Sequence, residues 1–257
     1  IFQEAQNNQV DFADLLDSNA SKGSIAVACL NSESAAYPID LLLQLKNRIA
    51  YLALVDGACN LFYDNQMLCK EFEPQLVTGD FDSVRPEVLQ YYKDLPSTEV
   101  IPTPDQDRTD FDKCLSCLLD SQRLNLNKEI ACILVLGGLG GRVDHTFGNL
   151  HTLVKWSSQC KPRIYFATQH DLWVCLPPCQ ESVECRLLRP RQGKYAGLIP
   201  LDQPCLNVYT SGLKWNLAGD TLSFTGLVST SNEAVDELII ARWSGGHLLI
   251  TVTYELT

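Results

Sequence analysis

The first 168 residues alternate short apolar runs with amphipathic runs, and this alternation restricts the chain to a small set of folds. The expected strands span residues 24–30, 50–55, 75–78, 99–102, 130–136 and 163–167, and the expected helices span residues 39–48, 86–93, 110–119 and 144–156. Strands that alternate with helices are typical of βαβ units, in which helices cover a mainly parallel sheet. We therefore expect an α/β domain with a Rossmann-like sheet at residues 22–168, preceded by an N-terminal extension at residues 1–21.

The remainder of the chain has a different pattern. Short β-rich runs, broken by Pro, Gly and Asn, occur at residues 172–176, 185–188, 206–209, 221–224, 237–242 and 247–254. This spacing predicts antiparallel strands. We therefore expect a second domain, a C-terminal antiparallel β-sandwich, at residues 169–257.

Composition and charge exclude several classes of protein. The formal net charge of −11 leaves no basic surface for non-specific binding of nucleic acid, and the chain has no apolar run of about 18 residues that would span a membrane. The eleven cysteines are an odd number, scattered through apolar stretches and loops, which favours reduced thiols. We expect a cytoplasmic protein that binds neither nucleic acid nor a membrane.

Acidic side chains gather where predicted strands end. The segments 79–83 and 105–110 carry five carboxylates between them, and each follows a predicted strand. Polar loops also follow the strands at residues 50–55 and 130–136. Because the carboxyl ends of parallel strands meet at one edge of a sheet, we expect these four loops to share one rim.

Magnesium suits such a rim, because it prefers oxygen ligands and is commonly bound by one or two carboxylates together with phosphate oxygens and water. If the backbone at Phe81 is extended, Asp80 and Asp82 point to the same side and can approach one ion. Asp56 and Asp110 would then complete a second position. The alternative is that these acids only start helices or lie in solvated turns.

A glycine-rich turn at residues 137–141 offers backbone amides to a phosphate, and Arg142 adds a charge that can bind two oxygens. The turn lacks the Lys-Ser/Thr ending of a P-loop, so its signal is weak by itself. Asp144 and His145 are candidates for a ligand and an acid–base group, or they simply begin a helix.

Two further residues lie at the expected start of the helix at residues 110–119. Thr109 is a candidate for its cap. Lys113, one turn on, either reaches a phosphate or forms a surface pair with Asp110.

Six motifs, in order along the chain, resemble those of the thiamin pyrophosphokinase family. They are Asp56-Gly57 with Asn60, then 79–83, 103–110 with Lys113 and Cys114, 137–145, 212–217 and 229–232. The resemblance implies an N-terminal catalytic domain, a C-terminal thiamin-binding β-sandwich and a homodimer whose sites form between subunits. It also implies transfer of a diphosphate from ATP to the hydroxyl of thiamin, which gives thiamin diphosphate and AMP.

The same resemblance implies roles for individual residues. Catalysis would involve Asp80, Asp82, Asp110 and Arg142, and Mg²⁺ would be held by Asp56, Asp80, Asp82 and Asp110. The nucleotide would be bound by Asp56, Asn60, Ser83, Thr109, Lys113 and Asp144. Thiamin would be surrounded by Gln106, Trp215, Ser231 and Asn232, with Trp215 and Asn232 supplied by the partner chain.

Several alternatives stay open at the level of sequence. Trp215 could stack on a cationic ring, but its alternation with Leu217 also fits an ordinary strand core. A metal-dependent phosphohydrolase with Asp80 or Asp82 as nucleophile would share the acidic motifs. A non-enzymatic protein that binds thiamin or divalent ions would share Trp215. Asp110 and Asp105 are both candidates for the group that takes the hydroxyl proton.

Overall fold

The computed structural model describes residues 9–17, 24–32, 37–120, 130–186 and 192–256. The chain divides into two compact units. One contains the described parts of residues 22–152 together with residues 166–169, and the other contains the described parts of residues 1–21, 153–165 and 170–257. Residues 153–165, which fall inside the expected first domain, thus group with the later part of the chain.

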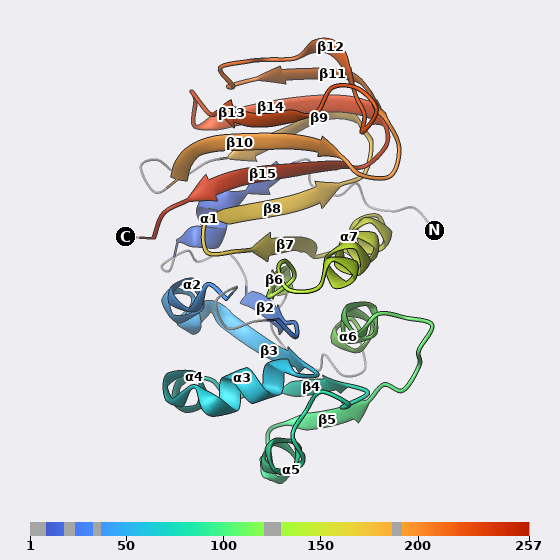
Figure 1. The fold of residues 1–257 in the computed structure, drawn as a ribbon. Coiled ribbons are helices and arrows are strands. Elements are labelled where there is room, and N and C mark those ends of the chain that lie inside the picture. The colour runs from blue at the N-terminus through green and yellow to red at the C-terminus, as the bar shows by residue number, and fades with distance from the viewer. Residues whose placement is uncertain (1–8, 18–23, 33–36, 121–129, 187–191, 257) are drawn as a thin grey trace. The chain divides into compact units, whose positions relative to one another are not determined.

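A parallel sheet forms the centre of the first unit, as the alternating pattern predicts (Figure 1). Its strands lie in the order β6 (Ile130–Leu136), β2 (Ser24–Cys29), β3 (Ile49–Val55), β4 (Leu76–Gly79) and β5 (Glu99–Pro102), and each neighbouring pair is parallel. From β2 the chain runs outwards to β5 and then returns to place β6 on the other side of β2. The strand order therefore reverses between β2 and β6, and open α/β sheets bind ligands beyond the carboxyl ends of their strands at such a position.

The central strands are buried, which explains why their sequences are continuously apolar. Val27 and Ala28 of β2, Leu54 of β3, and Leu134 and Val135 of β6 have no exposed surface. A parallel sheet is covered on both faces, so its strands carry apolar side chains at successive positions.

Helices flank this sheet (Figure 1). They are α2 (Ile39–Gln44), the short 3₁₀ helix η2 (Lys46–Arg48), α3 (Ala58–Asp64), α4 (Gln66–Glu71), α5 (Pro86–Asp94), α6 (Asp110–Leu118) and α7 (Val143–Ser157). The sequence pattern predicted α2, α5, α6 and α7 but missed α3 and α4, which are seven and six residues long. Local chemistry defines them instead: the Asn65 side chain caps α4 by accepting hydrogen bonds from the amides of Met67 and Leu68.

Strands from two sheets form the second unit and confirm the predicted β-sandwich (Figure 1). One contains β13 (Ser229–Glu233), β10 (Gln192–Pro200), β15 (Leu248–Tyr254) and β8 (Asp171–Leu176), and these pairs are antiparallel. The other contains β1 (Gln9–Asp11), β9 (Cys179–Arg186), β14 (Leu238–Gly245), β11 (Cys205–Ser211) and β12 (Ala218–Leu222). The division between the units falls within β7 (Arg163–Ala167).

The N-terminal segment, expected as an extension, contributes to the second unit. β1 pairs in parallel with β9, and α1 (Phe12–Leu16) follows it. The sequence pattern missed β1, β10 and β13 as strands, and β13 in particular has the polar sequence Ser-Thr-Ser-Asn-Glu. Among the described residues, no helix is both long and apolar enough to cross a membrane.

Candidate active site

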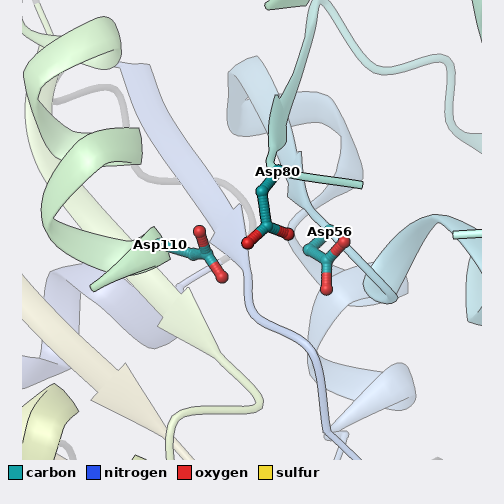
Figure 2. Close-up of side chains that lie close together, drawn as sticks. All are labelled: Asp56, Asp80 and Asp110. Atoms are coloured by element: carbon teal, nitrogen blue, oxygen red, sulfur yellow. The ribbon is translucent and has the colours of Figure 1, made fainter. Parts of the chain in front are cut away.

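Three carboxylates converge at the carboxyl edge of the parallel sheet. Asp56 follows β3, Asp80 follows β4 and Asp110 is the first residue of α6. Figure 2 shows their side chains turned toward one another, and one oxygen from each lies within 4.8 Å of the other two. Three negative charges at this separation repel one another, so the arrangement favours a bound cation.

Asp56 gives the strongest sign that a ligand is recognised here. The residue is 4% exposed, and its Oδ1 atom has no hydrogen-bond partner within the described parts of the chain. Burial raises the pKa of Asp56; hydrogen bonds from Ser83 and the Gly57 amide oppose this rise, and the charges of Asp110 and Asp82 add to it. A buried carboxylate oxygen without a donor is unfavourable unless a ligand completes it.

Asp80 is oriented by Gln106. The Gln106 side-chain amide donates a hydrogen bond of 3.0 Å to Oδ2 of Asp80. This hydrogen bond is the main reason that the pKa of Asp80 lies below its usual range. Gln106 was expected to contact thiamin, and in this structure its amide fixes a carboxylate of the acidic cluster.

The backbone between Asp80 and Asp82 is not extended, so the condition under which both carboxylates would point to the same side is not met. Phe81 has a φ of 65°, in the left-handed region, so the two carboxylates do not follow strand geometry. The Asp82 amide instead donates to Asp80, and the Asp82 carboxylate accepts a hydrogen bond of 2.9 Å from the Ser83 hydroxyl. Asp82 lines the same cavity but is not one of the three carboxylates whose oxygens converge.

Lys113 is buried, with 5% of its side chain exposed. Its ammonium group donates to the carbonyl oxygens of Thr103 at 2.8 Å and Asp105 at 3.0 Å, and it lies 2.7 Å from Oδ1 of Asp110. The expected pair with Asp110 is present, but it is not a surface pair. These two hydrogen bonds and the ion pair tie the loop after β5 to the start of α6.

Thr109 caps α6, as predicted: its hydroxyl accepts a hydrogen bond of 3.1 Å from the Asp112 amide. The same hydroxyl lies 2.9 Å from the Thr152 hydroxyl on α7. Thr109 therefore fixes the start of the helix that presents Asp110.

The glycine-rich turn brings a cation to the same cavity. Gly137 has a φ of 73°, and a Cβ atom there would lie 2.7 Å from the Leu30 carbonyl oxygen, so a larger residue does not fit. Arg142 forms an exposed, two-pronged pair with Asp144, at 3.1 Å and 2.5 Å, which lowers the pKa of Asp144. A phosphate presents the same oxygen geometry as this carboxylate, so it can take the guanidinium from Asp144.

Asn60 plays a part that the sequence did not indicate. Its side-chain amide donates to the Ser83 carbonyl oxygen at 2.7 Å, and its Oδ1 atom accepts from the Arg85 amide at 3.1 Å. Both ends of the side chain are thus used within the protein, and Asn60 fixes the turn that follows Asp82. It is not among the residues that line the cavity.

A cavity of about 320 Å³ joins these groups. Of the residues proposed from the sequence, those that line it are Asp56, Asp80, Asp82, Ser83, Gln106, Thr109, Asp110, Lys113, Arg142, Asp144 and His145. Sequence reasoning missed Asn31, Arg108 and Asn149, which also line it. Arg108 lies inside an acidic motif, which masks it as a separate candidate. Asn149 lies on α7, where its side-chain amide donates to the Gly138 carbonyl oxygen, and no local sequence pattern indicates this contact.

The β-sandwich unit holds the other three proposed residues. Trp215 is 55% exposed and lies between β11 and β12, so the reading of Trp215 and Leu217 as a strand core is wrong. Asn232 is 2% exposed, and its side chain accepts from the Trp215 amide at 3.2 Å and donates to the Trp215 carbonyl at 2.8 Å. Ser231 is exposed, with a φ of 56°. Asn232 therefore holds the backbone of Trp215, and the indole is presented to solvent.

The fold and the cavity define the class of protein. A carboxylate cluster and the exposed guanidinium of Arg142 lie at the switch point of a parallel sheet, and this combination is typical of α/β proteins that bind phosphate groups with a divalent ion. Residues 42–166 match the family model for the thiamin pyrophosphokinase catalytic domain, and residues 184–241 match the model for the thiamin pyrophosphokinase vitamin B1 binding domain. The chain belongs to the thiamin pyrophosphokinase family, whose members are ATP-dependent diphosphotransferases.

Individual relatives agree with this assignment. Thiamine pyrophosphokinase 1 of Oryza sativa subsp. japonica is 36% identical over 242 residues, which cover 86% of this chain and 88% of the relative. Thiamine pyrophosphokinase 2 of Arabidopsis thaliana is 35% identical, with 79% of this chain and 77% of the relative covered. The yeast thiamin pyrophosphokinase structure has the same fold, with a TM-score of 0.81 at 21% identity, over 99% of this chain and 94% of that one.

Proposed function

We propose that this chain transfers a diphosphate group from ATP to the hydroxyl of thiamin, which gives thiamin diphosphate and AMP. The observation that carries the proposal is the convergence of Asp56, Asp80 and Asp110 around an unpartnered buried oxygen, in a chain of this family. The donor set consists of oxygens alone, which fits Mg²⁺. Asp56, Asp80 and Asp110 would hold this ion, with Asp82 nearby, and when bound it neutralises charge on the phosphates.

The remaining cavity residues bind and orient the substrates. Arg142 leaves Asp144 to bind phosphate oxygens, and the amides of the glycine-rich turn approach the same group. Ser83, Thr109 and Asp144 line the nucleotide side, while Lys113 and Asn60 act by holding the loops that carry the acids. Much of the catalysis then comes from positioning and from charge neutralisation.

The chemical step is an in-line displacement. The thiamin hydroxyl oxygen forms a bond to the β-phosphorus of ATP, and the bond from that phosphorus to the bridging oxygen of the α-phosphate breaks, so that AMP leaves. The hydroxyl proton passes to a carboxylate. Asp110 is preferred over Asp105, because Asp110 lines the cavity, whereas the Asp105 carboxylate accepts a hydrogen bond from the Asp107 amide outside it.

One assay separates this function from its alternatives. The protein is incubated with ATP, Mg²⁺ and thiamin, and AMP and thiamin diphosphate are expected in equal amounts. Loss of ATP without any need for thiamin would indicate a phosphohydrolase that uses Asp80 or Asp82. Quenching of tryptophan fluorescence by thiamin, without AMP, would indicate a thiamin-binding protein.

We also propose that the chain acts as a homodimer in which Trp215 and Ser231 of one subunit and Gln106 of the other surround thiamin, while Asn232 holds the backbone of Trp215. The exposed Trp215, on a loop fixed by Asn232, supports this because tryptophan is enriched at interfaces, where its indole supplies a large apolar face. Six cysteines carry free thiols, which supports a reducing, cytoplasmic location: Cys29, Cys59, Cys69, Cys114, Cys175 and Cys205.

Shared sites predict complementation between inactive chains. A mixture of the Asp80→Asn and Trp215→Ala chains, unfolded and refolded together, should recover about a quarter of wild-type turnover, because half of the dimers are mixed and each mixed dimer keeps one complete site. AMP release by the refolded mixture measures this. If each site lies within one chain, every chain carries a lesion and the mixture stays inactive. Each variant refolded alone is the control.

A further inference from the structure

Trp215 already has a cation on its ring. The Lys214 ammonium group lies 4.6 Å from the centroid of the Trp215 indole, within the range of a cation–π interaction. The same ammonium group lies 3.2 Å from a carboxylate oxygen of Glu233 on β13. Lys214 is therefore held between an aromatic face and a negative charge.

The loop that carries this pair is fixed on both sides. The Lys214 amide donates to the Glu233 carbonyl at 2.8 Å, and the Leu213 amide donates to the Asn216 side chain at 3.1 Å. Gly212, with a φ of 83°, packs so closely that a Cβ atom would lie 2.2 Å from the Leu238 carbonyl oxygen. The indole is thus presented in one place, and little ordering is needed when a ligand arrives.

We propose that Lys214 is a specificity-determining residue that sets the affinity of Trp215 for cationic aromatic rings. This inference rests on the proposed function, because thiamin carries a positively charged thiazolium ring. If thiamin stacks on the face that Lys214 covers, the ammonium group must leave. If thiamin stacks on the opposite face, two cations share one indole and repel each other.

Both geometries predict the same direction of change in the affinity for thiamin when the Lys214 charge is removed. Loss of the Lys214 charge strengthens the binding of a cationic ring, whichever face of the indole is used. Removal of Lys214 also leaves the Glu233 carboxylate without this neighbouring ammonium, and the carboxylate then attracts the incoming cation. Lys214 therefore acts as a resident competitor that weakens thiamin binding.

The test is the Lys214→Met variant, which keeps the apolar stem and removes the charge. KM for thiamin is expected to fall about two- to fivefold with little change in kcat, as the size of an exposed cation–π interaction indicates. The dissociation constant of thiamin, from quenching of tryptophan fluorescence, should fall by the same factor, with Trp215→Phe to assign the signal. Lys214→Arg returns a cation to the ring and should restore the weaker binding.

The chain offers a matched control in the same unit. Arg242 lies over the Tyr209 ring at 4.3 Å, so Arg242→Met removes a similar cation–π pair from a place that is not proposed to bind thiamin. Its KM for thiamin should stay at the wild-type value. An unchanged or raised KM in Lys214→Met would overturn the inference while the function stands, whereas wild-type protein that makes no thiamin diphosphate would overturn the function itself.

Discussion

Replacement of Asp80 by Asn is expected to abolish the formation of AMP and thiamin diphosphate, with a loss on the order of 10³-fold or more in kcat/KM. The substitution removes one charge from three converging carboxylates, and the asparagine oxygen can still accept the hydrogen bond from Gln106. The loop geometry should therefore survive, while the affinity for Mg²⁺ falls. Turnover measured across a range of Mg²⁺ concentrations checks this expectation.

Thermal unfolding gives a second readout that does not depend on catalysis. Without Mg²⁺, Asp80→Asn should be slightly less stable than the wild type, because the lowered pKa of Asp80 means that the folded protein favours its charged form. Mg²⁺ should raise the Tm of the wild type and leave that of the variant nearly unchanged, since a ligand stabilises the fold that binds it. The control is Asp94→Asn on α5, where the carboxylate accepts a bond from Gln90 away from the cavity. Near-normal AMP release by Asp80→Asn would remove Asp80 from the mechanism.

The hydrophobic periodicity of the sequence predicts most of the fold and the position of much of the candidate site. A buried parallel sheet requires continuous apolar strands, and the ends of those strands then define one edge. For this reason the sequence alone predicts that Asp56 and Asp80, which are 24 residues apart, lie close together in the fold. The same argument places Asp110 at this edge, because Asp110 comes after β5 and its loop and is the first residue of α6.

Side-chain directions were not predictable in the same way. The left-handed conformation of Phe81 depends on how the chain turns after β4. Phenylalanine is not a residue type that indicates a positive φ. The sequence suggests that Asn60 and Asn232 contact ligands. In the structure, each side-chain amide instead forms hydrogen bonds with backbone groups that the fold brings close. Long-range packing decides such roles, so a motif alone cannot assign them.

Lys113 is another side chain whose role depends on long-range packing, so its substitution is a direct test of the site. Lys113→Met leaves two carbonyl oxygens without their donor and removes the positive charge beside the Asp110 carboxylate, which should lower the stability by about 2–3 kcal/mol. The loop that carries Gln106 should then lose its fixed position, and kcat should fall about 100-fold. Turnover and thermal unfolding, each measured with and without Mg²⁺, check both expectations. Lys93→Met, in the last turn of α5, is the matched control.

The response to Mg²⁺ distinguishes a positioning role from direct contact with the nucleotide. If Lys113 neutralises Asp110, its removal leaves the acidic cluster more negative, and Mg²⁺ should raise the Tm of Lys113→Met by more than it raises that of the wild type. If Lys113 instead binds a phosphate of ATP, the variant should show an unchanged response to Mg²⁺ alone and a raised KM for ATP. The second pattern would show that Lys113 binds ATP. Its hydrogen bonds to the carbonyl oxygens of Thr103 and Asp105 would then belong to the protein without nucleotide.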